Sequence, residues 1–544
     1  MTASDSFSSA IARPEPRRVD LLTARLLPPL PAAFLSGNDL KLLEPLRFLG
    51  AGELPQGPPP SADRRELAAA LAVANAAYGH PAAEELGRRL ADPATWVVVV
   101  GQQPGLFGGP LYTLAKAVSA SLWAKRLREA GEPAVAVFWM ATEDHDFREV
   151  SRAVFFHSGG PKLWDLGDDP SPLLPVGMRS LGPAVSSILA EVAETMPGER
   201  FRQWAETIAR WYRPDARFGE AFSRLLVHLL GKRCPLLVDA MLPAVKEAQR
   251  PWLRRLVERR RQVEEAFSGR DEEISRRGFE LQVRPKPGSA PLFLLHGRQR
   301  RRIEWRSGDR LALRGVEGVE EEVGWLEAAI RENPGVVSPG VLARPAIQDA
   351  ILGTAVHLGG PGEFSYLPQA AALYRVLDVE SPWVALRPQS LVLEEHQLAK
   401  LEASQLELEL LVAPEVELDT LVAGVEEEER LGPVRAKLAE ALEELRTKAL
   451  EVDPNLAAPW KKTQAQMERA LVAFAGRVTS ALARRQEVER GRAQSLRTVC
   501  RPLGAPPERV VSTAHFPGKY GERFVEAYFE QHGLDPSKLH VVCP

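Results

Sequence analysis

The stretch WVVVVGQQPGLFGGPLYTLAKA, residues 96–117, contains the pattern that predicts the fold of this chain. Its first residues form a continuous, mostly β-branched apolar run, which is typical of a strand buried on both faces of a sheet. A glycine-rich loop at 101–110 follows, and then a helix expected over 112–130, which Gly131 terminates. The apolar segment AVAVFWMATED, 134–144, comes next. Strand, loop, helix and strand in this order form a βαβ unit, so a parallel sheet is expected.

Strand-like segments recur at 234–240, 354–360 and 382–395. We therefore predict an α/β fold, with a doubly wound, Rossmann-like parallel-sheet core and its insertions over 96–395. A long, arginine-rich helix is expected over 242–267 after the first of these strands.

The segments on either side of this core differ from it in composition. Residues 1–95 combine proline-rich stretches with one helix expected over 66–90, and we predict that they pack on the core. Over 396–500 glycine nearly vanishes, and apolar residues keep heptad-like spacing on both sides of the sequence VDPN, which predicts an α-helical coiled-coil domain. The last segment, 501–544, is expected to return to the core.

Composition excludes several classes of protein. The chain has 544 residues and a formal net charge of −3, which argues against a general nucleic-acid or membrane-surface binder. Cys234, Cys500 and Cys543 form no CxxC pair, so neither a disulfide scaffold nor a cysteine-based zinc site is expected. We find no signal-peptide core and no apolar run of ~18 residues, and we expect a soluble, cytoplasmic protein.

The loop at 101–110 precedes a helix N-terminus, where free backbone N–H groups and the helix dipole favour an anion. It matches neither GxxxxGK[ST] nor GxGxxG, and a structural turn is the alternative interpretation. The substrate- or nucleotide-binding residues predicted here are Gly101, Gln102, Gln103, Gly105, Gly108, Gly109, Tyr112 and Lys116, with a solvated helix face as the alternative for Lys116.

Four consecutive ionisable residues, Glu143, Asp144, His145 and Asp146, end the second strand. They fall at the carboxyl edge of the predicted sheet, where open α/β folds bind ligands. Such a group can act as a general base, anchor a substrate amine or bind a metal ion. An acidic turn that caps the next element is the alternative. We predict that these four residues are catalytic.

The third polar region is RPAIQDAILGTAVHLGGPGEFSYLPQ, residues 344–369. Its GGPG sequence repeats the pattern of a glycine loop after a strand, and Tyr366 and Gln369 are expected to share a helix face. Arg387 follows a later strand and suits a phosphate or carboxylate, with a surface salt bridge as the alternative. The binding residues predicted here are Gln348, Asp349, Gly360, Gly362, Glu363, Tyr366, Gln369 and Arg387.

The motifs GQQPGLFGGPLYTLAKA, VFWMATEDHDF, the 344–369 segment and PLGAPPERV…YGERF resemble, in this order, the bacillithiol biosynthesis cysteine-adding enzymes, a family of cysteine ligases. The resemblance implies a C–N ligase that joins L-cysteine to the amine of glucosaminyl-malate, the last step in forming the low-molecular-weight thiol bacillithiol. It also implies a core like that of class I aminoacyl-tRNA synthetases and a homodimer formed through the coiled coil.

The resemblance further implies a nucleotide, ATP with Mg²⁺, as co-substrate beside the two small-molecule substrates. The synthetases have histidines in the first loop, whereas Gln102 and Gln103 stand here, and no second lysine-rich signature follows PWVALRPQS. The role of those histidines in adenylation is therefore not part of what the resemblance implies. The cysteine and histidine ligands of related zinc-dependent cysteine ligases are missing, so no zinc, and no other resident metal, is expected.

Within such a ligase, residues 143–146 would position the amine and transfer its proton, and the loops at 101–110 and 359–363 would frame the acyl and nucleotide groups. Two other functions fit the motifs. One is a metal-dependent hydrolase or transferase of a sugar conjugate that uses 143–146 as ligands. The other is a non-catalytic, nucleotide-sensing assembly protein that acts through its coiled coil.

Overall fold

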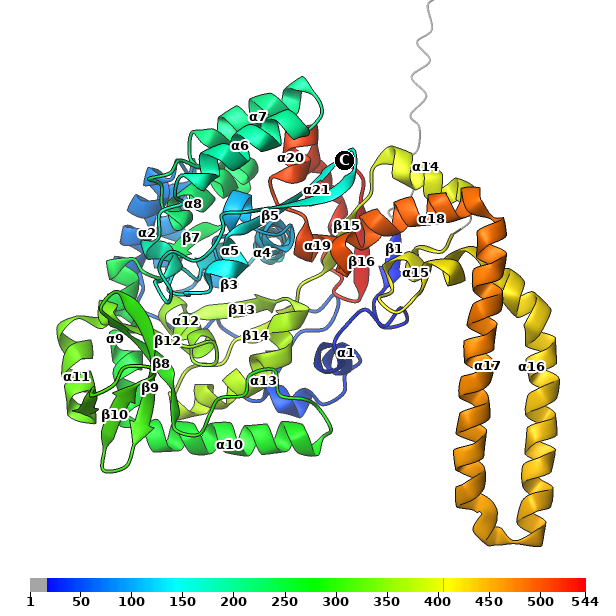
Figure 1. Ribbon diagram of the computed structural model, residues 1–544. Coiled ribbons are helices and arrows are strands. Elements are labelled where there is room, and N and C mark those ends of the chain that lie inside the picture. Colours follow the sequence, from blue (N-terminus) through cyan, green and yellow to red (C-terminus); the bar gives the residue numbers. More distant parts are fainter. Residues whose placement is uncertain (1–16, 405) are drawn as a thin grey trace, which may run out of the picture.

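A six-stranded parallel sheet forms the centre of the chain, as seen in a computed structural model that describes residues 17–404 and 406–544 (Figure 1). The strands lie in the order β2-β14-β13-β3-β4-β7. Their bounds are β2 (Arg47–Phe48), β14 (Trp383–Leu386), β13 (Thr354–Gly359), β3 (Trp96–Gln102), β4 (Ala134–Met140) and β7 (Leu236–Asp239). The predicted doubly wound core is confirmed.

The direction of winding reverses beside β3. From β3 the chain passes through α4 (Tyr112–Glu129) to β4 and later to β7 on one side, whereas β13 and β14 lie on the other side. All of β3 and β4 is buried, as the continuous apolar runs predict. The connections that leave the carboxyl ends of β3 and β13 therefore run in opposite directions along the sheet. This makes a topological switch point, the usual ligand site of such sheets.

Two helices that the sequence pattern predicts as single are each divided. The segment expected as one helix at 66–90 forms α2 (Arg65–Ala77) and α3 (Ala83–Ala91), because Gly79 has a φ of +87° and Pro81 follows it. The helix expected over 242–267 ends at Glu258, and a second helix starts at Arg260. These are α9 (Pro243–Glu258) and α10 (Arg260–Arg276).

Two insertions extend the core. The first lies between β4 and β7 and contains α5 (Phe147–Val150), β5 (Arg152–His157), β6 (Gly160–Asp165), α6 (Ala184–Thr195), α7 (Glu199–Ala209) and α8 (Phe218–Leu230). The second contains an antiparallel sheet of order β11-β10-β9-β8-β12. Its elements are β8 (Ser289–His296), β9 (Gln299–Arg306), β10 (Arg310–Leu313), β11 (Glu320–Glu322), α11 (Val323–Glu332) and β12 (Val337–Pro339). Helices α12 (Arg344–Leu352) and α13 (Pro361–Val376) then flank β13.

The predicted coiled-coil region is a helical hairpin that projects from the body of the molecule (Figure 1). Its arms are α16 (Leu418–Val452) and α17 (Ala457–Arg485), and the VDPN sequence spans the end of α16 and the turn between them. Short helices join the hairpin to the body: α14 (Glu395–Ser404) and α15 (Leu408–Val412) before it, and α18 (Glu487–Cys500) after it. Among the helices of the described residues, none combines the length and apolarity needed to cross a bilayer.

After the hairpin the chain returns to the core through α19 (Pro507–Val510), α20 (His515–Tyr520) and α21 (Glu522–Gln531). Strand β16 (Lys538–Val542) then pairs with β15 (Gln389–Val392) in parallel and with β1 (Arg18–Asp20) in antiparallel register. The remaining helix of the N-terminal segment, α1 (Pro29–Leu35), packs near α13. Segments from both ends of the described chain thus meet beside the carboxyl edge of the central sheet.

Candidate active site

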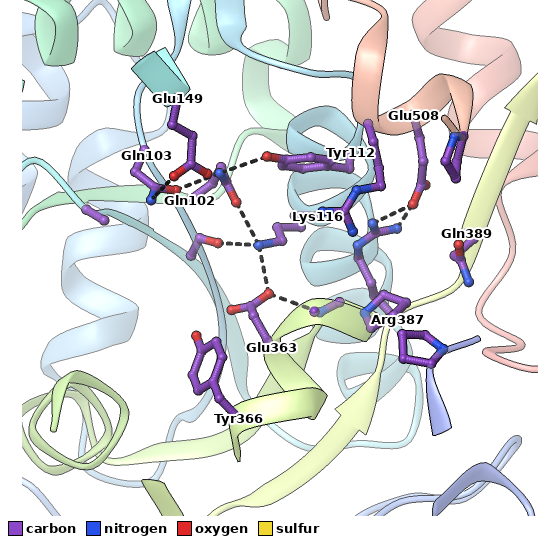
Figure 2. Close-up of a pocket in the computed structure, with 18 of the residues that line it drawn as sticks. Gln102, Gln103, Tyr112, Lys116, Glu149, Glu363, Tyr366, Arg387, Gln389 and Glu508 are labelled. Carbon is purple, nitrogen blue, oxygen red and sulfur yellow. Dashed lines mark hydrogen bonds and ion pairs between the residues drawn. The ribbon is translucent and has the colours of Figure 1, made fainter. Parts of the chain in front are cut away.

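A cavity of about 840 Å³ lies at the switch point. Its walls come from the loops after β3 and β4, the start of α13, the inner face of the antiparallel sheet and the segment around α19. Figure 2 shows the loop after β3, the start of α13 and the segment around α19. Its volume is near the upper end of the range for small-molecule sites, so it can hold more than one substrate.

Lys116 joins the two glycine loops. It lies one turn into α4, is buried, and its Nζ donates to Gly101 O at 2.6 Å and to Gln102 Oε1 at 2.9 Å. The same Nζ is 2.7 Å from Glu363 Oε2 at the start of α13 (Figure 2). Burial alone would raise the pKa of Glu363, but the charges of Lys116 and Arg344 lower it to about 2. The carboxylate is therefore ionised, and the ion pair closes the floor of the cavity.

The paired glutamines connect the first loop to the acidic end of β4. Gln102 Nε2 donates to Gln103 Oε1 at 2.7 Å and to the Tyr112 hydroxyl at 3.1 Å. Gln103 Nε2 donates to Asp144 Oδ2 at 3.0 Å and to Glu149 Oε2 at 2.9 Å. These glutamines hold two carboxylates in position at the cavity wall.

The other glycines of the loop do not line the cavity. Gly108 has a φ of +86°, and a Cβ there would lie 2.9 Å from Thr513 Cβ; a Cβ on Gly105 would lie 2.7 Å from Gly109 Cα. The N–H groups of Gly108 and Gly109 donate within the protein, to the Tyr212 hydroxyl and to Leu106 O. The expectation of an anion held by free N–H groups of this part of the loop is therefore wrong. Gly108 allows close packing against the C-terminal segment instead, and Gly105 allows close packing against Gly109 within the loop.

Replacing Gly108 by alanine is expected to lower the free energy of unfolding by about 1–3 kcal/mol, because a Cβ would have to accept both a positive φ and the contact with Thr513. Chemical denaturation measures this loss. Substrate KM values should stay unchanged in the folded fraction. A raised KM without loss of stability would show that Gly108 contributes to substrate binding.

The four residues 143–146 take different positions. Glu143 is buried and forms an ion pair with Lys246 of α9. Asp144 and His145 also line the cavity. Asp146 does not, because it caps α5 and its Oδ1 accepts the Glu149 N–H at 3.2 Å. The four side chains therefore do not converge on one point, and the alternative of a capping turn holds for Asp146.

The charge states of Asp144 and His145 follow from their burial and from the groups around them. Burial would raise the pKa of Asp144, but the charge of Arg300 and hydrogen bonds from Gln103 and the His145 N–H lower it, so the carboxylate is ionised. Burial and the charge of Arg300 lower the pKa of His145, and the imidazole is therefore neutral at neutral pH.

Glu149 is a cavity residue that the sequence analysis missed. Burial raises its pKa, the charges of Asp144 and Asp146 raise it further, and the result is about 7. A carboxyl group that titrates there can accept a proton at neutral pH. The sequence signal was the spacing D-x-x-E in DFRE, a capping pattern that turns Glu149 back beside Asp146.

The third predicted region is only partly in the cavity. Gly360, Gly362, Glu363 and Tyr366 line it, and Arg344, which also lines it, donates to the Tyr366 hydroxyl at 3.0 Å. Three predicted residues lie behind this wall: Gln348, Asp349 and Gln369.

The partners of these three residues explain their positions. Gln348 accepts from Arg344 Nη1 at 2.9 Å, and Asp349 Oδ2 lies 3.1 Å from His357 Nδ1. Gln369 Nε2 donates to Asp271 Oδ1 on α10 at 2.8 Å. The i, i+3 spacing from Tyr366 therefore does not bring Gln369 to the cavity, because α10 covers that side of α13.

Arg387 forms a buried ion pair, not a surface one. Its Nη2 and Nη1 donate to Glu508 Oε1 and Oε2 at 2.7 and 3.1 Å, and both side chains are 3% exposed (Figure 2). Glu508 also accepts the Ser390 N–H at 3.2 Å. Glu508 was not predicted, since nothing in the sequence links position 508 to position 387.

Charge in the cavity favours anionic substrates. Eight cationic side chains and five carboxylates line it, which leaves an excess of three formal positive charges. The cationic residues are Arg25, Lys116, Arg300, Arg302, Arg344, Arg387, Arg501 and Arg509, and the acidic residues are Glu143, Asp144, Glu149, Glu363 and Glu508. Within 17–404 and 406–544 no group of three or more His, Cys, Asp or Glu side chains is arranged to hold a metal ion.

Comparison with known proteins gives the same match along almost the whole chain. Residues 54–388 match the family described as "Bacillithiol biosynthesis BshC, N-terminal Rossmann-like domain", and 390–539 match its "C-terminal coiled-coil domain". A relative from Solibacter usitatus is 32% identical over 84% of this chain and 85% of its own. Relatives from Heliobacterium modesticaldum and Salinibacter ruber are 31% and 28% identical over 82% and 88% of this chain, and 83% and 89% of theirs. All three carry the name "Putative cysteine ligase BshC".

Proposed function

The chain belongs to the bacillithiol biosynthesis BshC family of ligases, and from this premise we propose that it joins L-cysteine to the amine of glucosaminyl-malate to form bacillithiol. The observation that carries this proposal is the position of Glu149. It is held by Gln103 in a cavity with excess positive charge, at the switch point of the sheet. The cavity would bind an anionic sugar conjugate, and the carboxylate would remove a proton from its amine.

In this proposal the residues have separate roles. The substrate amine is protonated in water and must lose a proton before it attacks the cysteine carboxyl carbon. Glu149, with a pKa of about 7, would accept that proton, and the ionised Asp144 would hold the ammonium group beforehand. Lys116 and Glu363 would fix the floor on which the acyl group lies.

Amide formation from a carboxylate needs an activated carboxyl group, and we propose ATP with Mg²⁺ as the co-substrate that supplies the activation. The cationic residues Arg25, Arg302 and Arg509 line the cavity, and in the described parts of the chain no carboxylate forms an ion pair with them. These three side chains fit a polyphosphate. No zinc is part of the proposal.

Incubation of the purified chain with L-cysteine, glucosaminyl-malate and Mg-ATP tests the function. Bacillithiol should appear by mass spectrometry only when both substrates and the nucleotide are present. Release of AMP or of ADP identifies the bond of ATP that is broken. Product formed without ATP would refute the nucleotide's role, and metal-dependent breakdown of glucosaminyl-malate would favour the hydrolase alternative.

We also propose that the hairpin pairs with that of a second copy. Its arms expose apolar side chains that a single chain leaves uncovered: Val434, Leu438, Leu445, Val452, Met467, Val472 and Phe474. Replacing Val472 and Phe474 together by glutamate is expected to halve the mass seen in sedimentation velocity. Val73→Glu, on an exposed position of α2, is the matched control and should leave the mass unchanged. A wild-type chain that sediments as a monomer at micromolar concentration would refute the dimer.

A further inference from the structure

Arg300 on β9 is fixed beside the cavity by hydrogen bonds to uncharged groups, and its Nη1 also lies 3.9 Å from Asp144 Oδ1. Its side chain is 8% exposed. Nε donates to Ser338 Oγ at 2.9 Å, Nη2 donates to Pro339 O at 2.8 Å, and the guanidinium lies 3.8 Å from the centre of the Phe293 ring. The remaining nitrogen, Nη1, is 3.2 Å from Nδ1 of His145.

This last contact determines where the imidazole carries its proton. A guanidinium can only donate, so Nδ1 must accept, and a neutral ring with a lone pair on Nδ1 has its proton on Nε2. The competing partner is Asp144 Oδ1, which is 3.8 Å from Nδ1 and therefore beyond hydrogen-bond distance. We infer that Arg300 is a positioning residue that holds His145 as the neutral Nε2–H tautomer, with this N–H available as a hydrogen-bond donor.

The charges around His145 agree with a neutral ring. Asp144 and Asp146 on its own segment favour the protonated form, and Arg300 and Arg302 on β9 oppose it. Burial acts in the same direction as the arginines, and the net effect lowers the pKa of His145. Protonation of Nδ1 would also replace the hydrogen bond from Arg300 by the repulsion of two donors.

The tautomer changes the chemistry that His145 can perform. A neutral imidazole with Nε2–H donates a hydrogen bond and can stabilise negative charge that develops on an acyl or phosphoryl oxygen. It does not accept a proton through Nε2, so proton removal is left to Glu149. This role toward substrate rests on the proposed function, whereas the tautomer is a property of the free protein.

Nitrogen-15 NMR of protein labelled at its histidines tests the tautomer directly, with the His145 signals assigned by their loss in His145→Gln. In the free wild-type protein at pH 7 we expect the chemical shift of an unprotonated Nδ1 and of a protonated Nε2. A protonated Nδ1 would overturn the inference without any variant of Arg300.

Variants of two arginines on the same face of the sheet separate the hydrogen bond from the charge. Arg300→Met should give a mixture of both tautomers and a raised His145 pKa. Arg300→Lys should keep the pKa low but still give the mixture, because the ammonium ends at about the place of the guanidinium carbon and does not reach Nδ1. Arg302→Met is the matched control, since Arg302 also lies over Phe293, at 4.5 Å, but does not contact Nδ1. It should keep the Nε2–H tautomer. The same tautomer in wild type and in both Arg300 variants would overturn the positioning role.

Activity of two amide variants tests the donor role. The amide nitrogen of His145→Gln reaches about the place of Nε2, and that of His145→Asn about the place of Nδ1. The glutamine variant should therefore keep at least tenfold more of kcat than the asparagine variant. An equal loss in both would refute the donor role. If the wild type forms no bacillithiol, the proposed function fails, and the NMR result still decides the tautomer.

Discussion

Replacing Glu149 by glutamine is expected to lower kcat/KM for bacillithiol formation by about 10²–10⁴-fold, the usual contribution of a general base. The amide keeps the size of the side chain and a hydrogen-bonding oxygen for Gln103, but it cannot accept a proton. Glu191→Gln, at an exposed position of α6 whose carboxylate pairs with Lys162, is the matched control and should retain full activity.

The pH dependence gives a second test of the same residue. Because the pKa of Glu149 is about 7, wild-type kcat/KM should rise with pH through this value as the carboxylate ionises. Glu149→Gln should lack this rise. An unchanged pH profile in the variant would assign the proton transfer to another group.

The loss of activity expected in Glu149→Gln is not caused by unfolding. A carboxyl group whose pKa is raised from its ordinary 4.5 to about 7 in the folded state destabilises the fold progressively as pH rises through that interval. Glu149→Gln removes this effect, so at pH 8 it should melt at the same temperature as the wild type or higher. A lower melting temperature would point to a structural role instead.

Replacing Glu508 by alanine is expected to lower the free energy of unfolding by about 3–5 kcal/mol, because it leaves the guanidinium of Arg387 buried without its partner. Chemical denaturation measures the loss. The matched control is Glu526→Ala, which removes another two-bond pair with an arginine, Arg233, at exposures of 41% and 58%. That exposed pair should contribute at most about 1 kcal/mol.

A double variant distinguishes the cost of an unpaired charge from the net value of the pair. Arg387→Met with Glu508→Leu should be much closer to wild type than Glu508→Ala alone, since both buried charges are then absent. A double variant as unstable as the single one would show that the pair itself, and not the orphaned charge, stabilises the fold.

The sequence predicts the parts of this protein that depend on local pattern. Continuous apolar runs predicted the buried positions of β3 and β4, and heptad-like spacing located the hairpin. Gln102, Gln103 and Lys116 line the cavity because a strand end and a helix start bring them to the same edge. In each case the residues that meet are close in sequence, so geometry follows from periodicity.

Two of the residues that were missed, Glu508 and Arg300, depend on contacts across the fold. Glu508 contacts Arg387 although the whole hairpin lies between them in the sequence. In the sequence Arg300 is one of several charges in the run RQRRR, and only the folded sheet brings it to His145. Asp146 was predicted to be catalytic because it adjoins the other three residues, but its carboxylate caps the N-terminus of α5. The side chains of neighbouring residues therefore need not point to the same place.

The pair between Arg387 and Glu508 limits how this chain can recombine with its relatives. The two family matches meet between residues 388 and 390, so a crossover there would look natural, but it would take the two members of a buried ion pair from different parents. A crossover in the hairpin turn at 452–455 would fall far from the cavity but would still divide the same pair. An exchange of the hairpin arms with both ends rejoined to their own parent, in contrast, takes Arg387 and Glu508 from the same chain. Shuffled libraries of this family should accordingly yield active chimeras by exchanging the projection as a cassette, and not by exchanging everything that follows it.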